Sequence, residues 1–322
     1  MNAQPVKIKY SFLKILTGSD LSRRRLPLMQ AESVNPGPVL FLTACAHGDE
    51  VGGIAVIQEV FKQIRTQLLR GSVIAFPLMN PTGFETTSRS IVMSEEDLNR
   101  SFPGNPRGTL AQRIADIIFT HIVNTRPAVV LDLHNDWSRS IPYAVIDPMT
   151  DPGCAEAYDK TLRFASMTGF INVLEPEEHA HENTLTCSLI KINIPALVLE
   201  LGESYVVNET NIRFGIDSIF NILRELEMVK SAGEPFLYPA PEIARSRVLH
   251  YFERPLSSTS GIIRLNVKPG DFVRKGRKLA RIYNAFGKHL ETLTAMHDGI
   301  VLGTTDYSVA FPGATVIVFG NL

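Results

Sequence analysis

The sequence has few cysteines and lacks any long apolar run. Its three cysteines among 322 residues, Cys45, Cys154 and Cys187, form no CxxC pair, and their odd number argues against a disulfide framework and a thiolate-only metal site. We expect them to be buried as small apolar side chains. No stretch reaches the roughly 18 apolar residues of a membrane span, and residues 1–16 lack the apolar core of a secretory signal. We therefore expect a cytoplasmic protein.

Neither sign of charge is in excess, since 32 basic side chains nearly cancel 33 acidic ones. This balance gives no reason to expect nucleic acid or an anionic membrane as a partner. A chain of 322 residues exceeds the usual single-domain size, so we expect one large domain and a smaller one.

Apolar runs alternate with amphipathic segments over the first 230 residues. The runs at 38–46, 72–79, 128–133 and 195–201 are typical of strands buried on both faces. The segments 54–69, 110–123 and 212–228 are predicted to be helices. This alternation predicts an α/β sheet that helices cover on both sides, with the chemistry at the strand ends.

The pattern changes near residue 250 to short alternating segments separated by glycine turns, which is typical of an all-β module. Proline, glycine and small residues concentrate within 231–241, where we expect the boundary. We predict a large α/β domain of residues 1–240 and a C-terminal β domain of residues 241–322.

Three candidate metal ligands lie where predicted strands end. His47 and Glu50 follow the first run in HGDE, and His134 ends the third in LDLHN. Two imidazoles and one carboxylate suit a borderline-soft divalent ion, and three protein ligands leave a position open for water or substrate. Asp132 and Asn135 flank His134 and could fix its tautomer.

Glu200 ends another apolar strand, in VLELG, where an ionisable group is seldom left without a partner or a task. We interpret it as the general base that takes a proton from the attacking water and passes it to the leaving amine. The alternative is a buried ion pair without a catalytic part.

These motifs, with several others in the same order, resemble the succinylglutamate desuccinylase/aspartoacylase family, relatives of the zinc carboxypeptidases. The resemblance rests on AHGDE (46–50), NPTGF (80–84), Arg89, DLNRSFPG (97–104), LDLHN (131–135) and LELG (199–202). It covers most of the first 205 residues.

The resemblance implies a mixed sheet flanked by helices, as in zinc carboxypeptidases, and one zinc ion per chain held by His47, Glu50 and His134. It also implies that Glu200 assists the water and that Arg89 stabilises the oxyanion. Asn99 and Arg100 would grip the α-carboxylate of the substrate. A guanidinium is suited to both tasks because it stays charged and pairs bidentately with carboxylates. A solvated loop position for Arg89 and a capping or turn role for DLNR are the alternatives.

The C-terminal segment resembles the half-barrels of biotinyl and lipoyl domains in its VKPGDFVRKG turn and its trailing DGIV. No lysine stands where a carrier domain attaches its cofactor, because TLTAM precedes HDG. Two interpretations remain: a cap that restricts the active site or mediates subunit contacts, and a packing module.

The motifs together predict a zinc-dependent hydrolase that cleaves the amide bond of a small N-acyl amino acid. The acyl group, the amino acid and the oligomeric state are not predicted, although a homo-oligomer is compatible with the sequence. Two alternatives are a carboxypeptidase-type peptide hydrolase and a non-catalytic zinc- or ligand-binding protein of the same fold.

Overall fold

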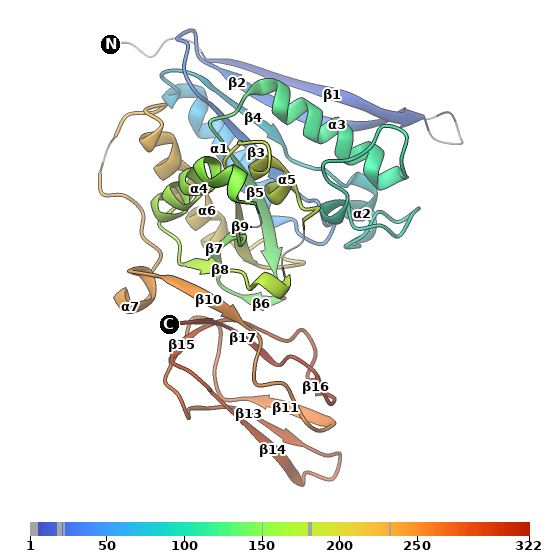
Figure 1. The fold of residues 1–322 in the computed structure, drawn as a ribbon, viewed down its shortest axis with the longest axis vertical. Helices are drawn as coiled ribbons and strands as arrows, with labels where there is room; N and C mark the ends of the chain where they lie inside the picture. Colours follow the sequence, from blue (N-terminus) through green and yellow to red (C-terminus); the bar gives the residue numbers. More distant parts are fainter. Residues whose placement is uncertain (1–5, 18–20, 22, 150, 180–181, 232) are drawn as a thin grey trace.

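The computed structural model describes residues 6–17, 21, 23–149, 151–179, 182–231 and 233–322 (Figure 1). Within these residues, a mixed sheet runs in the order β1-β2-β4-β3-β5-β9-β7-β8-β10-β17-β15-β12, with β6 beside β15. Its strands are β1 (Lys7–Thr17), β2 (Arg23–Glu32), β3 (Val39–Ala44), β4 (Ser72–Phe76), β5 (Val129–Asp136), β6 (Arg139–Ser140), β7 (Pro142–Ile146), β8 (Asn172–Leu174), β9 (Ala196–Glu203), β10 (Val248–Phe252), β12 (Phe272–Val273), β15 (Gly299–Thr304) and β17 (Ile317–Asn321).

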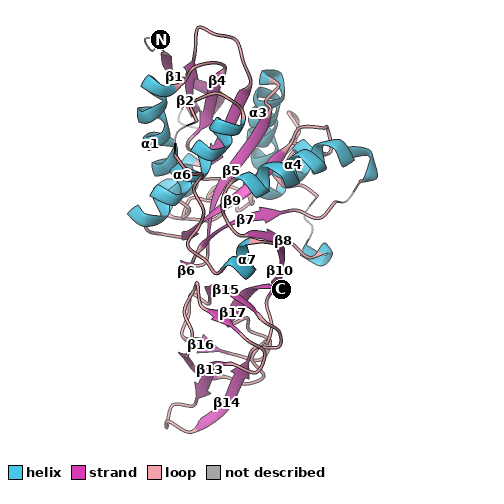
Figure 2. Cartoon of the chain, turned by 90° about the vertical axis from the view of Figure 1, so that its left-hand side faces the viewer, coloured by secondary structure: helices cyan, strands magenta, loops and turns pink. Residues whose placement is uncertain are grey.

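Helices cover both faces of this sheet, as the sequence predicted. They are α1 (Gly52–Gln67), α2 (Pro81–Thr86), α3 (Leu110–Thr125), α4 (Ala155–Met167), α5 (Leu185–Ile190), α6 (Glu209–Glu225) and α7 (Glu242–Arg245), with the 3₁₀ turns η1 (Leu98–Arg100), η2 (Pro152–Cys154) and η3 (Glu177–His179). Helices α1 and α6 pack together over one face through residues such as Val56 and Ile216, whereas α3 lies over the other (Figure 2). Ile118 of α3 and Leu189 of α5 belong to the same buried cluster on that second face. Burial of these side chains is the main stabilising contribution.

The predicted elements agree with the structure within a few residues, with two differences. The strand expected to close at His134 continues to Asp136, so this histidine lies inside β5. Residues 7–17 and 23–32, which the sequence pattern assigned to no element, form the antiparallel pair β1–β2 at the edge of the sheet. All three cysteines are free and buried, which confirms their predicted burial.

The C-terminal segment consists of strands and loops from Val248 onward. Four of its strands form a second sheet in the order β14-β13-β11-β16: β11 (Gly261–Leu265), β13 (Lys278–Tyr283), β14 (His289–Thr294) and β16 (Val309–Ala310). The others join the main sheet, because β10 pairs in parallel with β8 and in antiparallel with β17. The half-barrel likeness and the boundary at residue 240 stay predictions.

No helix in the part of the chain that the structure describes has the length and apolarity needed to span a membrane.

Candidate metal centre and substrate cavity

The candidate site lies where three neighbouring parallel strands end. Strand β5 pairs in parallel with β3 on one side and with β9 on the other, so their carboxyl ends meet at one edge. His47 follows β3, His134 lies near the end of β5, and Glu200 stands opposite His134 in β9. The topology therefore brings together three predicted site residues that are far apart in sequence.

The turn after β3 is shaped by close packing against α2 and the loop that follows it. Cys45 adopts a positive φ of 56°, a conformation that is costly for a non-glycine residue and is often found at functional sites. Glycine is required three residues later, at Gly48, because a Cβ there would lie 1.9 Å from the carbonyl carbon of Gly83. The Gly48 N–H donates to the carbonyl oxygen of Ser88 at 2.9 Å. This turn directs the next side chains, including Glu50, toward the strand ends.

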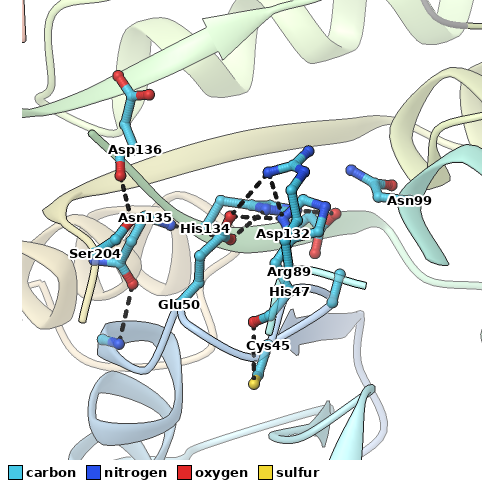
Figure 3. Close-up of polar contacts among 12 residues, drawn as sticks. Cys45, His47, Glu50, Arg89, Asn99, Asp132, His134, Asn135, Asp136 and Ser204 are labelled. Carbon is cyan, nitrogen blue, oxygen red and sulfur yellow. Dashed lines mark hydrogen bonds and ion pairs between the residues drawn. The ribbon is translucent and has the colours of Figure 1, made fainter. Parts of the chain in front are cut away.

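His47, Glu50 and His134 form a buried cluster whose ligand atoms all lie within 4.8 Å of one another. Their exposed fractions are 2%, 3% and 4%. The two carboxylate oxygens of Glu50 lie 2.5 Å from Nδ1 of His47 and 2.7 Å from Nδ1 of His134 (Figure 3). Two imidazole nitrogens and a carboxylate thus converge on one point, which is a donor set suited to a divalent metal ion.

The outer nitrogen of each histidine faces an aspartate. Oδ1 of Asp97 lies 3.1 Å from Nε2 of His47, and Oδ2 of Asp132 lies 2.9 Å from Nε2 of His134. Carboxylates in this position orient a metal-binding imidazole and fix its tautomer. The contact of Asp132 was expected from the sequence, whereas Asp97 was missed, because DLNR was interpreted as a substrate-binding motif from its asparagine and arginine alone.

Asn135 does not share this task, since no hydrogen bond joins its side chain to the ring of His134 in the described residues. Its Oδ1 accepts from the backbone N–H of Gly52 at 3.0 Å, and its Nδ2 donates to the carbonyl oxygens of Gly202 and Glu203. Asn135 thus ties the end of β5 to the start of α1 and to β9.

The charges within the cluster shift the pKa values of His47, Glu50 and His134. Burial alone would lower the pKa of His47 and of His134, but the carboxylates around them raise the pKa of both above the usual range. Burial would raise the pKa of Glu50, yet the two histidines hold it well below its usual value. In the absence of a metal ion, the imidazoles of His47 and His134 therefore hold protons at the nitrogens that would bind the metal. Metal binding must displace these protons.

Glu200 lies in the same cavity with one carboxylate oxygen, Oε2, that is buried and has no hydrogen-bond partner in the part of the chain described. Burial and the negative charge of Asp136 raise the pKa of Glu200 well above that of an ordinary glutamate, against the opposing effect of His134. A carboxyl with a raised pKa can exchange a proton near neutral pH.

Arg89 reaches the metal cluster from a half-exposed position. Its Nη2 lies 3.2 Å from Oδ2 of Asp97, and its Nη1 lies 3.7 Å from Oε1 of Glu50. Figure 3 shows its guanidinium beside the three candidate ligands. The structure thus brings Arg89 to the cluster.

Asn99 and Arg100 lie in the turn η1 and line the same cavity, whose volume is about 480 Å³. Oδ1 of Asn99 accepts from the backbone N–H of Leu185 at 3.0 Å, and Nη1 of Arg100 donates to the carbonyl oxygen of Asn99 at 3.0 Å. Asn99 is only 6% exposed, and its side chain lines the cavity beside that of Arg100.

Several lining residues were not anticipated from the sequence, among them Asp147, Glu175, Tyr251 and Glu253. Tyr251 and Glu253 come from β10 and the residue after it, in the C-terminal segment. Of these residues, Asp147 could have been identified from the sequence, because it directly follows an apolar run, as the predicted ligands do.

Comparison with known proteins gives a consistent result. A family model for the succinylglutamate desuccinylase/aspartoacylase catalytic domain matches residues 36–226. The N-alpha-acetyl-L-2,4-diaminobutyric acid deacetylase of Halomonas elongata is 29% identical over 290 residues, which cover 86% of this chain and 80% of that protein.

Solved structures share the fold along nearly the whole chain. A succinylglutamate desuccinylase/aspartoacylase from Rhodobacter sphaeroides superposes with a TM-score of 0.78 at 23% identity, covering 99% of this chain and 96% of that one. The product-bound ectoine utilization protein EutE (DoeB) from Ruegeria pomeroyi superposes with a TM-score of 0.80 at 21% identity, covering 100% of this chain and 98% of that one.

Proposed function

The chain belongs to the succinylglutamate desuccinylase/aspartoacylase family, and on that basis we propose that it hydrolyses the amide bond of a small N-acyl amino acid. The observation that carries this proposal is the convergence of His47, Glu50 and His134 on a cavity that Glu200, Asn99 and Arg100 also line. The relative from Halomonas is named for the deacetylation of an N-acetyl amino acid, which belongs to this substrate class.

We propose zinc as the metal, held by His47, Glu50 and His134. The donor set fits it, because two Nδ1 atoms and a carboxylate meet while aspartates hold both outer nitrogens. When bound, zinc supplies Lewis-acid chemistry, which polarises a carbonyl group and makes a water molecule more acidic.

The remaining chemistry falls to side chains of the chain itself. Glu200 would take the proton of the attacking water, as its raised pKa favours, and deliver it to the nitrogen of the leaving amine. Arg89 would stabilise the negative charge that develops on the carbonyl oxygen. Arg100 and Nδ2 of Asn99 would bind the α-carboxylate, which places the scissile amide beside Glu200.

The test is the metal content of the purified protein, together with the release of free amine from a panel of N-acetyl and N-succinyl amino acids before and after chelation. Near-stoichiometric zinc and activity that the chelator abolishes are expected. Tight metal binding without cleavage of any N-acyl amino acid would contradict the proposal.

A carboxypeptidase-type peptide hydrolase would use the same cluster, and peptides of increasing length test it against an acetyl amino acid. A cavity of about 480 Å³ lies toward the small end of ligand sites, which favours the acyl amino acid. A strong preference for longer peptides would reverse this assignment.

A further inference from the structure

Strand β1 lies at the open edge of the main sheet, at the opposite end of the molecule from the C-terminal segment (Figure 1). It pairs in antiparallel with β2 and with no other strand in the described chain. Its backbone groups that point away from β2 can therefore accept an additional strand. Strand β2 pairs with β4 only from Met29 to Glu32, so β1 and β2 continue beyond the sheet as a two-stranded ribbon, here called the edge ribbon.

One face of the edge ribbon is packed against the protein. Leu13 of β1 and Leu26 and Leu28 of β2 belong to the same apolar cluster as Ile118 of α3. Leu26 and Leu28 are almost completely buried. The ribbon is thus anchored along this face, and its opposite face is presented in a fixed orientation.

The opposite face exposes two aromatic side chains. Successive side chains of a strand point to opposite faces, so Tyr10 and Phe12 lie on the other side of the ribbon from Leu13. They are 61% and 63% exposed. The guanidinium of Arg25 lies over the ring of Phe12, 5.9 Å from its centroid. Grouped exposed aromatic side chains are typical of an interaction surface.

The same face carries positive charge that the described chain does not neutralise. Phe12, Lys14, Arg23 and Arg25 line one hollow of about 270 Å³. Lys14 stands directly opposite Arg25 in the antiparallel pair, an arrangement in which like charges destabilise a sheet. No ion pair joins Lys14, Arg23 or Arg25 to a carboxylate among the described residues. A negatively charged partner would relieve this repulsion.

The charge and the open edge together restrict the kind of partner. Strand β1 contains three lysines and no acidic residue, so a second copy of β1 would add three more lysines and no carboxylate. Lysines on an edge strand hinder such pairing. An acidic strand would instead be attracted. The open edge favours a polypeptide over other polyanions, because an extended chain has N–H and C=O groups that pair with those of β1.

We infer that β1 is a docking edge for an extended, acidic segment of another protein. The segment adds a strand beside β1, its carboxylates contact Lys14 and Arg25, and its apolar side chains cover Tyr10 and Phe12. This surface lies outside the candidate catalytic cavity, so the inference stands independently of the proposed function.

The experiment measures the binding of a fluorescein-labelled octapeptide, in which glutamate alternates with valine, by fluorescence anisotropy at physiological ionic strength. We expect it to bind at least about 10-fold more tightly than the same peptide with lysine in place of glutamate. A version with every backbone nitrogen methylated keeps the charges but cannot donate to a strand, and it should lose about 10-fold or more.

Lys14→Glu and Arg25→Glu should each weaken binding of the acidic peptide about 10-fold or more. Lys268→Glu, at an exposed position of the C-terminal segment, is the matched control and should bind as the wild type does. All three changes affect exposed side chains, so thermal denaturation should match that of the wild type.

Absence of binding, equal affinity for the acidic and the lysine peptide, or no loss in Lys14→Glu and Arg25→Glu would overturn the inference. Undiminished binding of the methylated peptide would exclude strand addition. Tighter binding of a thymidine oligonucleotide than of the acidic peptide would assign the surface to a nucleic acid instead. A dimer of the chain alone, seen by sedimentation and dispersed in Lys14→Glu, would assign the edge to a second copy and likewise contradict the inference.

Discussion

Oδ2 of Asp132 lies 2.9 Å from Nε2 of His134, two residues further along β5. Asp132 is completely buried, and its Oδ1 accepts from the hydroxyl of Thr43 at 2.7 Å, so the carboxylate is fixed at both oxygens. The orientation of one candidate metal ligand is thus determined by the strand that carries it and by the neighbouring strand β3.

Asp132→Asn should weaken zinc binding about 10- to 100-fold, because the amide no longer supplies the charge that orients and polarises the imidazole of His134. Competition with a chromophoric chelator measures the Kd. Asp159→Asn, on the exposed face of α4, is the control and should bind zinc as the wild type does. An unchanged Kd in Asp132→Asn would mean that the contact has no effect on the metal.

Glu200→Gln should retain zinc and lose at least about 100-fold in kcat, the lower range expected for a general base. Metal analysis and steady-state kinetics on the same preparation separate the two effects. Glu227→Gln, at an exposed position after α6, should be unaffected. Unchanged turnover in Glu200→Gln would refute the assignment of the base and favour a buried structural carboxyl.

Arg100→Ala should raise KM about 30-fold or more for a substrate with a free α-carboxylate, which corresponds to the loss of about 2 kcal/mol from a charge pair. The wild type should discriminate strongly against the α-methyl ester of the same substrate, and Arg100→Ala should discriminate little. Arg107→Ala, in an exposed loop, should keep the wild-type preference. If Arg100→Ala discriminates against the methyl ester as strongly as Arg107→Ala does, Arg100 does not bind the α-carboxylate.

The titration of Glu175 predicts a pH dependence of stability. Its pKa is raised from 4.5 to about 8 by burial and by Asp147, Asp136 and Glu253, so the folded chain holds this proton more tightly than the unfolded chain does. Between about pH 5 and pH 8, unfolding releases the proton, and the contribution of Glu175 to the free energy of unfolding falls as the pH rises.

Glu175→Gln should therefore match the wild type in Tm near pH 5 and exceed it by about 2 °C at pH 8. Thermal denaturation followed by circular dichroism across this range measures the difference, with the exposed Glu234→Gln as control. A difference that does not change with pH would show that Glu175 titrates normally.

The sequence predicted the parts of the fold that depend on local pattern. Apolar runs located β3, β5 and β9, and polar residues at the ends of the first two strands identified the cluster of His47, Glu50 and His134. This works because parallel strands that are buried on both faces have a distinct composition, and their carboxyl ends meet at one edge.

The positions of Glu175 and Glu253 in the cavity lining could not be predicted in this way, for two reasons. Strand β8 has only three residues, too few for a recognisable alternation, and Glu253 reaches the cavity only because β10 pairs with a strand more than 70 residues earlier in the chain. Pairing over that distance is set by tertiary packing and leaves no local signal. The contact of Asp97 with His47 could not be predicted either, because it depends on how the loop before η1 packs against the turn after β3.

The pairing of β10 with β8 also determines how the C-terminal segment can be studied. Removing the chain from residue 248 onward would strip β8 of its outer neighbour and leave a row of unpaired backbone N–H and C=O groups at the edge of the main sheet. Such an edge is a template for pairing with other chains, so the truncated protein should aggregate whatever its intrinsic selectivity. The segment is thus a covering strand as well as a module, and single substitutions at Tyr251 and Glu253, rather than deletion, can reveal what it adds to recognition.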